Sequence, residues 1–265
     1  MRKAVVSEVQ AADVLHIVIP MAGRGSRFAS VGYGPPKPLI PIHGLPMIAC
    51  VIRNLTPNRP HRFLFLCLDE HLDDYGLGEQ LRAWSPGCMV IPVRSVTEGA
   101  ACTVLLAREH IDHSAPLMVA NCDQWVDVSI DAYLDGLAAH DGLIMTMWGD
   151  HPKWSFIRRD ATGRVVGVVE KQVVSNEATV GIYNFRCGAD FVRAAEAMIA
   201  KNVRVNGEFY VAPAYDELIA GGGSVGTWDV GTGMHGIGTP EDLALFLANP
   251  RSVAVYGGEN GEARR

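Results

Sequence analysis

The stretch IVIPMAGRGSRFASVGYGPPKPL (17–39) joins an apolar run to a loop rich in glycine and positive charge. The loop contains Gly23, Gly25 and Arg27, and Lys37 follows further on between two prolines. Two glycines alone are typical of a tight turn. Glycine also lets backbone N–H groups come close to a ligand and surround phosphate oxygens. The added cations favour a phosphate-binding loop over a simple turn.

Similar apolar runs recur through the first half of the chain, each followed by a segment with helical periodicity. The pairs are HIVIP and PMIACVIRNL, RFLFLCL and LGEQLRAW, CMVIPV and EGAACTVLLAREH, and PLMVAN and IDAYLDGLAAH. This alternation predicts an α/β fold with a mostly parallel sheet and helices on both faces. Ligands of such sheets bind beyond the carboxyl ends of the strands, so we expect the site in the loops after HIVIP and PLMVAN.

The second half of the chain has a different pattern. WSFIRRDATGRVVGVVEK predicts a hairpin that turns at DATG, ATVGIYNF predicts another strand, and residues 189–201 and 208–220 have helical periodicity. Thr239 and Pro240 suit the N-cap and the first position of a last helix. We expect one domain over 15–250, with halves 15–150 and 151–250 and with terminal tails at 1–14 and 251–265. The Gly-rich second tail is expected to fray.

The composition limits the partners and the location of the protein. The 265 residues carry a net charge of −6, which argues against a nucleic-acid binder because phosphate backbones require a basic surface. The six cysteines form no C-x-x-C pair, and no stretch has the apolar length of a signal peptide or a membrane span. We expect a soluble, reduced, cytoplasmic protein that binds neither nucleic acid nor a membrane.

Several motifs, taken in order, resemble those of one enzyme family. The glycine loop lacks the G-x-x-x-x-G-K-[ST] pattern of a P-loop and the third glycine of a dinucleotide fingerprint. PMAGRGSRF…PPKPLIPIHGLPMI instead resembles the signature of the sugar-phosphate nucleotidyltransferases, the NDP-sugar pyrophosphorylases. TEGAACTVLLA, MVANCDQ, VVEKQ, ATVGIYNF, NGEFYV and GTPEDL match later family motifs. The resemblance covers roughly 16–250 and implies a Rossmann-like, mostly parallel mixed sheet of the nucleotide-diphospho-sugar transferase type.

The resemblance also implies a reaction. A nucleoside monophosphate passes from a nucleoside triphosphate (NTP) to a phosphorylated small molecule, such as a sugar 1-phosphate, and pyrophosphate is released. Positioning and charge neutralisation supply most of the rate in such chemistry. Residues 15–150 become the nucleotide-binding half and 151–250 the acceptor-binding half.

The implied catalytic residues are Arg27 and Lys37, at the α-phosphate and the leaving pyrophosphate. The other implied site residues are Ala22, Gly23, Arg24, Gly25 and Ser26 at the triphosphate, Glu98 and Gly99 at the base, and Glu170, Lys171, Lys153, Asn206 and Glu208 at the acceptor.

Asp123 is the residue that the resemblance assigns to Mg²⁺, which takes one or two protein carboxylates together with phosphate oxygens. The family commonly has a second metal-binding Asp in a D-x-G-T pattern before the last helix, but Gly236 stands at that place here. An intact D-x-G-T begins earlier, at Asp229. Either Asp229 supplies a second ligand, or Asp123 alone holds the metal with phosphate and water.

The identity of the two substrates stays open. The Glu98 carboxylate accepts hydrogen bonds only, which suits a base edge that donates, such as cytosine or guanine. Ala22, which some pyrimidine-using branches of the family share, adds to this, so CTP or UTP is favoured. The acceptor is a sugar phosphate or, given the altered Asp region and the run HPKWSF, a non-sugar phosphate or phosphonate used by a cytidylyltransferase.

Two alternatives belong to other functional classes. One is a glycosyltransferase that uses an NDP-sugar, with NCDQ as its metal motif; it has no triphosphate to neutralise, so the charged loop argues against it. The other is a non-catalytic nucleotide-binding regulator, against which the intact set of Arg27, Lys37 and Asp123 argues. A homo-oligomer is compatible with the resemblance.

Overall fold

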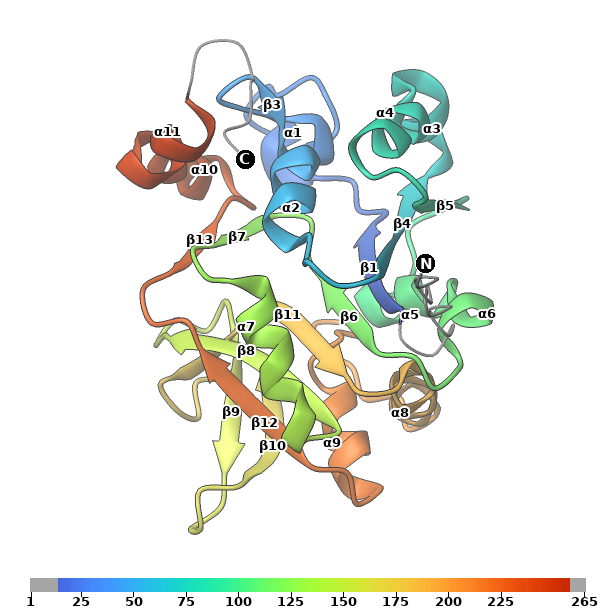
Figure 1. Ribbon diagram of the computed structural model, residues 1–265, viewed down its shortest axis with the longest axis vertical. Coiled ribbons are helices and arrows are strands. Elements are labelled where there is room, and N and C mark those ends of the chain that lie inside the picture. The colour runs from blue at the N-terminus through green and yellow to red at the C-terminus, as the bar shows by residue number, and fades with distance from the viewer. Residues whose placement is uncertain (1–13, 258–265) are drawn as a thin grey trace, which may run out of the picture.

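The opening apolar run forms β1 (Leu15–Met21), a central strand of the computed structural model, which describes residues 14–257 (Figure 1). β1 pairs in parallel with β4 (His61–Leu68) on one side and with β6 (Leu117–Ala120) on the other. Successive side chains alternate between the two faces of the sheet: Phe65 belongs to one core cluster and Leu64 to another. Burial on both faces explains the continuous apolar sequence of these strands.

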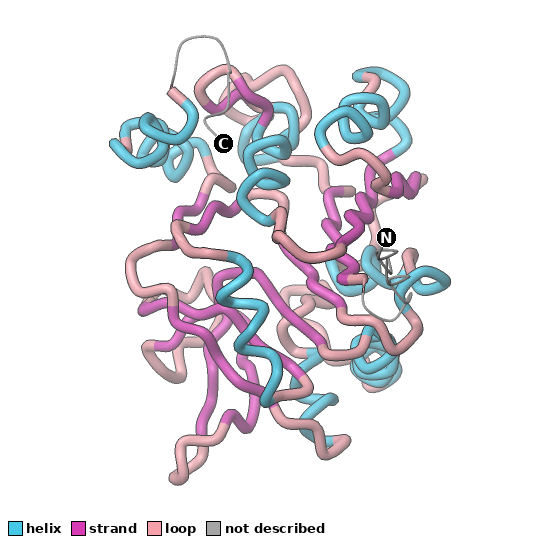
Figure 2. The backbone as a smooth tube through the Cα atoms, in the orientation of Figure 1, coloured by secondary structure: helices cyan, strands magenta, loops and turns pink. Residues whose placement is uncertain are grey.

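The large sheet, whose strands are magenta in Figure 2, contains parallel and antiparallel pairs. Its other strands are β5 (Met89–Val93), β8 (Gly142–Trp148), β9 (Ser155–Arg159), β10 (Val165–Glu170), β11 (Glu177–Phe185) and β12 (Val225–Asp229). The main order is β10-β9-β11-β6-β1-β4-β5, and β8 pairs with β11 and β12 off this path. β11 runs antiparallel to its neighbours, whereas β6, β1, β4 and β5 are parallel. The predicted mostly parallel sheet therefore changes direction at β11.

Helices cover both faces of the sheet, as predicted (Figure 1). The core on the Phe65 face includes residues of α2 (Met47–Leu55), α4 (Leu77–Trp84), α7 (Ile130–Asp135) and α10 (Pro240–Ala248). The core on the Leu64 face includes residues of α5 (Ala100–Leu105), α6 (Arg108–Ile111), α8 (Gly188–Ala200) and α9 (Ala214–Ala220). The structure also has α1 (Ser26–Ala29), η2 (Lys37–Leu39), α3 (Asp69–Tyr75) and η3 (Gly136–Ala139). None of the helices between residues 14 and 257 is long and apolar enough to cross a membrane.

The second half follows the sequence prediction with one difference. β9 and β10 form the predicted hairpin, and ATVGIYNF forms most of β11. The helix predicted over 208–220 is shorter: α9 starts at Ala214, because residues 205–208 form a turn closed by a β-bridge. Thr239 caps α10 as predicted, since its hydroxyl oxygen accepts a hydrogen bond from the backbone N–H of Asp242 at 3.1 Å.

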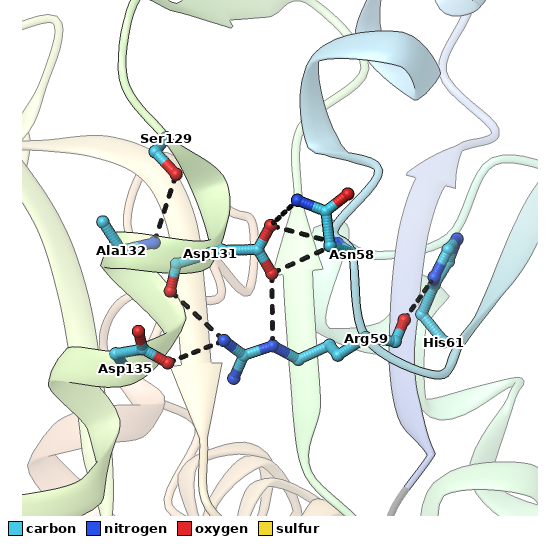
Figure 3. A network of polar contacts seen from close by, with 7 residues as sticks. All are labelled: Asn58, Arg59, His61, Ser129, Asp131, Ala132 and Asp135. Carbon is cyan, nitrogen blue, oxygen red and sulfur yellow. Dashed lines mark hydrogen bonds and ion pairs between the residues drawn. The ribbon is translucent and has the colours of Figure 1, made fainter.

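A polar network ties the segment before β4 to α7 (Figure 3). The Asp131 carboxylate accepts hydrogen bonds from the backbone and side-chain N–H groups of Asn58 and from Nε of Arg59. The same guanidinium donates to Asp135 at 2.7 Å. Exposed ion pairs contribute little stability individually. We therefore infer that the main effect of this network is to fix the position at which β4 enters the sheet.

The predicted tail at 251–265 is wrong for its first residues, because α11 (Pro250–Tyr256) packs on the domain. Tyr256 is 7% exposed. Its hydroxyl accepts a hydrogen bond from Nε1 of Trp125 at 3.0 Å and donates to the carbonyl oxygen of Cys50 at 3.2 Å. Residues 258–265, and the predicted tail at 1–14 apart from its last residue, lie outside the described residues.

Replacing Tyr256 with Ala tests whether α11 belongs to the folded domain. The variant loses a buried ring and two hydrogen bonds, so we expect its free energy of unfolding to fall by about 3–5 kcal/mol. Val255→Ala is the matched control, because Val255 lies on the same helix but is 44% exposed; its effect should stay within about 0.5 kcal/mol. Urea denaturation measures both, and equal values for the two variants would contradict this packing.

Candidate active site

A cavity of about 530 Å³ opens at the carboxyl ends of β1 and β6, where the sequence predicts the site. Its lining from the first half of the chain includes Gly23, Gly25, Ser26, Arg27, Lys37, Ala100, Asn121, Asp123 and Gln124. Its lining from the second half includes Lys153, Trp154, Ser155, Glu170, Lys171, Thr179, Gly181, Tyr183, Glu208, Tyr210 and Gly238. The structure therefore brings both predicted catalytic residues, Asp123 and most of the predicted acceptor residues to one cavity.

Gly25 shapes the loop at the entrance. Its φ of 60° lies in the left-handed region, which favours glycine. A Cβ atom on this residue would lie 2.9 Å from Cβ of Lys37, so glycine also permits the close packing of the loop against η2. Arg27 lies just beyond, on α1, with its side chain exposed on the cavity wall.

Lys37 reaches across the cavity from η2 to the end of β6. Pro36 and Pro38 flank it, and the proline rings restrict the backbone that carries it. Its ammonium group forms an ion pair with Oδ2 of Asp123, and both side chains are about one-fifth exposed, at 20% and 21%. Burial lowers the pKa of Lys37, but the Asp123 carboxylate outweighs this effect, and the pKa lies above its ordinary value. Lys37 is therefore a cation at neutral pH.

A small two-stranded sheet fixes Asp123 from the other side. β7 (Gln124–Val126) pairs with β13 (Met234–Gly236), and Ile237 continues the contact by donating its N–H to the carbonyl oxygen of Asp123 at 2.9 Å. A Cβ atom on Gly238 would lie 2.3 Å from Oδ2 of Asp123. The segment that replaces the family's D-x-G-T motif thus makes room for the Asp123 carboxylate.

The metal site that the resemblance implies rests on this one carboxylate. Within residues 14–257 no three His, Cys, Asp or Glu side chains form a cluster that could hold a metal ion. Mg²⁺ is commonly bound by one or two carboxylates plus substrate phosphate oxygens, so Asp123 beside a phosphate-binding loop fits the donor set.

Asp229 is not part of this candidate metal site. The residue ends β12, it is exposed, and its Oδ1 accepts the N–H of Gly231 at 2.9 Å. The predicted second ligand is corrected on this ground, because Asp229 closes a turn and lies outside the cavity lining.

The second half of the chain contributes a buried acid and two lysines to the cavity. Ser155 donates a hydrogen bond to the Glu170 carboxylate, and Nζ of Lys171 lies 3.6 Å from its other oxygen. Lys171 has a φ of 55° and places Nζ 4.5 Å above the ring of Tyr210. Lys153 also lines the cavity, with Nζ 3.6 Å from Oδ1 of Asp242.

The charge of Glu170 is set by opposing effects. Burial raises its pKa and outweighs the hydrogen bond from Ser155 and the positive charge of Lys171, so the pKa lies above the ordinary glutamate value.

Some predicted site residues lie outside the cavity lining. Ala22 is buried in the core on the Leu64 face, and Arg24 is exposed to solvent. Glu98 forms an ion pair with Arg204 at 2.9 Å, and Gly99 packs against the backbone of Phe209.

Asn206 also lies outside the lining. It occupies the turn at 205–208 with a φ of 51°, so the structure does not bring it to the cavity with the other predicted acceptor residues.

The structure adds cavity residues that the sequence reasoning missed. Gly181 is the clearest: its φ is 92°, and a Cβ atom there would lie 2.3 Å from Oε1 of Gln124 and 2.4 Å from Nδ2 of Asn121. A glycine inside a strand pattern signals a bulge or a close approach, and β11 does shift its register against β8 between Thr179 and Tyr183. Ser155 and Tyr210 carried no comparable signal.

Comparison with known proteins agrees with this arrangement. The family model described as Nucleotidyl transferase matches residues 17–205, more than half of the chain. The chain belongs to the nucleotidyl transferase family. The bifunctional protein GlmU of Ralstonia pickettii (strain 12J) is 26% identical over an alignment of 217 residues, which covers 78% of this chain and 45% of the relative. This nucleotidyl transferase thus spans about half the length of the curated relative that it matches.

Solved structures share the fold of this nucleotidyl transferase. The nucleoside-diphosphate-sugar pyrophosphorylase from Vibrio cholerae RC9 matches with a TM-score of 0.77 and 25% identity, over 88% of this chain and 100% of that chain. The inositol-1-phosphate CTP transferase from T. maritima matches with a TM-score of 0.70 and 16% identity, over 94% and 97% of the two chains. The second likeness shows the fold alone, and both confirm the predicted Rossmann-like architecture.

The raised pKa of Glu170 predicts how stability depends on pH. Between the ordinary glutamate pKa and the raised value, the folded state binds more protons than the unfolded state, so stability falls as pH rises through this window. Glu170→Gln cannot ionise and should gain stability relative to the parent as pH rises from about 4.5 to 7.

Glu177 provides the matched control. Burial raises its pKa, but the hydrogen bonds from Arg159, Thr227 and Thr146 and the positive charge of Arg159 together outweigh this effect, and the pKa lies below its ordinary value. Glu177→Gln should therefore lose stability relative to the parent at pH 7 and approach it as pH falls. Urea denaturation across this range measures both variants, and the same pH trend in the two would contradict the assignment.

Proposed function

We propose that this protein transfers a nucleoside monophosphate from an NTP to a phosphorylated small molecule and releases pyrophosphate. An oxygen of the acceptor phosphate attacks the α-phosphorus of the NTP and forms a new P–O bond. The bond from the α-phosphorus to the oxygen that bridges it to the β-phosphorus breaks, and the electron pair leaves with pyrophosphate. The enzyme needs no covalent intermediate, because positioning and charge neutralisation carry such reactions.

The observation that carries the proposal is the meeting of Lys37, Arg27 and Asp123 at the end of the glycine loop. The two cations and the carboxylate surround one small volume, and a triphosphate is a ligand whose binding requires such charged groups. Lys37 supplies a point charge, and Arg27 supplies a planar fork with several donors, so the two neutralise different phosphate oxygens. Preorganised cations at the reacting phosphate stabilise the charge that develops in the transition state.

Asp123 would hold Mg²⁺ in this proposal. When bound, the ion would neutralise part of the charge on the triphosphate and on the leaving pyrophosphate. The Lys37 ammonium now occupies one carboxylate oxygen of Asp123. The pair therefore loosens as a triphosphate brings competing oxygens to Lys37.

The second half of the chain supplies the acceptor site. Lys171 and Lys153 are cations from the second half that line the cavity, and they suit the acceptor phosphate. Glu170 is an acceptor of hydrogen bonds deep in the cavity and suits a hydroxyl or N–H group of the acceptor molecule. A sugar 1-phosphate meets these requirements, and so does a non-sugar phosphate or phosphonate with a polar group.

The cavity residues constrain the identity of the nucleobase of the NTP less than they constrain the acceptor. The argument for CTP or UTP rested on the Glu98 carboxylate and on Ala22; the ion pair with Arg204 weakens the Glu98 part, and Ala22 lies outside the cavity lining. We place the base next to Ala100, which lines the cavity at the start of α5. A glycosyltransferase that uses an NDP-sugar is the weaker proposal, because it leaves Lys37 and Arg27 without a triphosphate to neutralise.

A pyrophosphate-release assay tests the proposal. The common NTPs are crossed with sugar phosphates, phosphorylated non-sugar compounds and phosphonates, with Mg²⁺ present. At least one pair should release pyrophosphate, and Lys37→Ala should lower kcat for that pair by about 10³-fold, in the range found when a transition-state charge partner is removed.

Lys201→Ala is the control for removal of a lysine. Lys201 also forms an ion pair, with Glu217 at 2.6 Å, but it lies at the end of α8 and outside the cavity lining. Its turnover should equal that of the parent. Release of no pyrophosphate from any pair, together with sugar transfer from an NDP-sugar, would overturn the proposed function.

A further inference from the structure

The two halves of the cavity are joined behind its wall by a set of contacts that we call the clasp. The clasp consists of Glu98, Gly99 and Ala101 from the first half and Arg204 and Phe209 from the second. The first segment leads into α5, and the second follows α8.

Backbone hydrogen bonds form the centre of the clasp. The N–H of Phe209 donates to the carbonyl oxygen of Glu98 at 2.8 Å, and the N–H of Ala101 donates to the carbonyl oxygen of Phe209 at 3.0 Å. Gly99 lies between these bonds with a φ of 137°. A Cβ atom on it would lie 2.4 Å from the carbonyl oxygen and 2.5 Å from the nitrogen of Phe209. Any side chain at this position must push the two segments apart.

Arg204 adds a second layer to the clasp. Its guanidinium donates to Glu98 Oε2 at 2.9 Å and stacks 4.0 Å above the ring of Phe209. It also donates to the carbonyl oxygen of Gly207 at 3.1 Å, within the turn at 205–208. That turn has positive φ angles at both central residues, 51° and 83°, as in a tight two-residue hairpin turn. Arg204 thus connects the turn, the ring and the opposite segment.

The clasp has its own small core. Phe209 is 1% exposed and packs with Ala101 and with Met198 of α8, in a cluster separate from the two cores on the faces of the sheet. Because packed side chains move together, a shift of one segment carries the other with it.

The clasp lies directly behind residues that line the cavity. Glu208 and Tyr210 flank Phe209 in the chain and line the acceptor wall, and Ala100 lies between Gly99 and Ala101 and lines the nucleotide wall. We infer that the clasp couples the two halves of the site: it transmits the position of the nucleotide-side segment to Glu208 and Tyr210, and the position of the acceptor-side segment back to Glu98 and Ala100. This inference rests on the proposed function, and Arg204 and Gly99 are positioning residues in it.

Two variants on opposite halves test the coupling in the full-length enzyme. Gly99→Ala changes the nucleotide side, yet it should raise KM for the acceptor, because the new Cβ displaces Phe209 and its neighbours. Arg204→Glu changes the acceptor side, yet it should raise KM for the NTP by releasing Glu98. We expect about tenfold in each case, within the range of coupling between sites. A variant that merely loses folded enzyme lowers the apparent kcat and leaves both KM values unchanged.

Lys201→Glu is the matched control, because it reverses one charge in an ion pair away from the clasp; both of its KM values should equal those of the parent. Arg204→Glu keeps the test decisive if Gly99→Ala does not fold. If the parent is active and Arg204→Glu keeps the parent KM for the NTP, the coupling is overturned and the proposed function stands. If the parent releases no pyrophosphate with any substrate pair, the proposed function falls and this inference falls with it.

Discussion

The ion pair between Lys37 and Asp123 is the contact on which the site depends. It links η2, which follows the glycine loop and carries Lys37 between two prolines, to the end of β6. It thereby connects two segments of the cavity wall. Gly25 allows Lys37 to approach from one side, and Gly238 leaves room for the Asp123 carboxylate on the other. Two glycines far apart in the chain therefore leave the space in which one cation and one anion form an ion pair. The rest of the cavity is arranged around this pair.

The sequence predicted the parts of the fold that local patterns determine. The alternation of apolar strands and helices gave the layered sheet, and the Thr239–Pro240 pair gave the start of α10. The glycine-rich loop could be singled out because it combines residues of special geometry with clustered charge in one short segment. Glu170 and Lys171 were singled out through motif resemblance, and their burial and contacts became visible only in the folded chain.

The errors share a physical cause, which is that contacts distant in sequence decide the role of a polar side chain. Glu98 and Asp229 are acidic residues in suggestive motifs, but each is occupied elsewhere, by Arg204 and by the N–H of Gly231. Asn206 belongs to a turn, which its Asn-Gly pair could have signalled. The docking of α11 includes a buried tyrosine that contacts Trp125, a partner that no local pattern identifies.

The most direct measurement of the central claim follows the α-phosphorus itself by ³¹P NMR, with the enzyme, Mg²⁺, an NTP and its phosphorylated acceptor. The account predicts that the α-phosphorus signal moves into a diphosphate linkage with the acceptor phosphorus, while one equivalent of free pyrophosphate appears. Pyrophosphate formed together with free nucleoside monophosphate, or an acceptor phosphorus that never couples to the α-phosphorus, would contradict it.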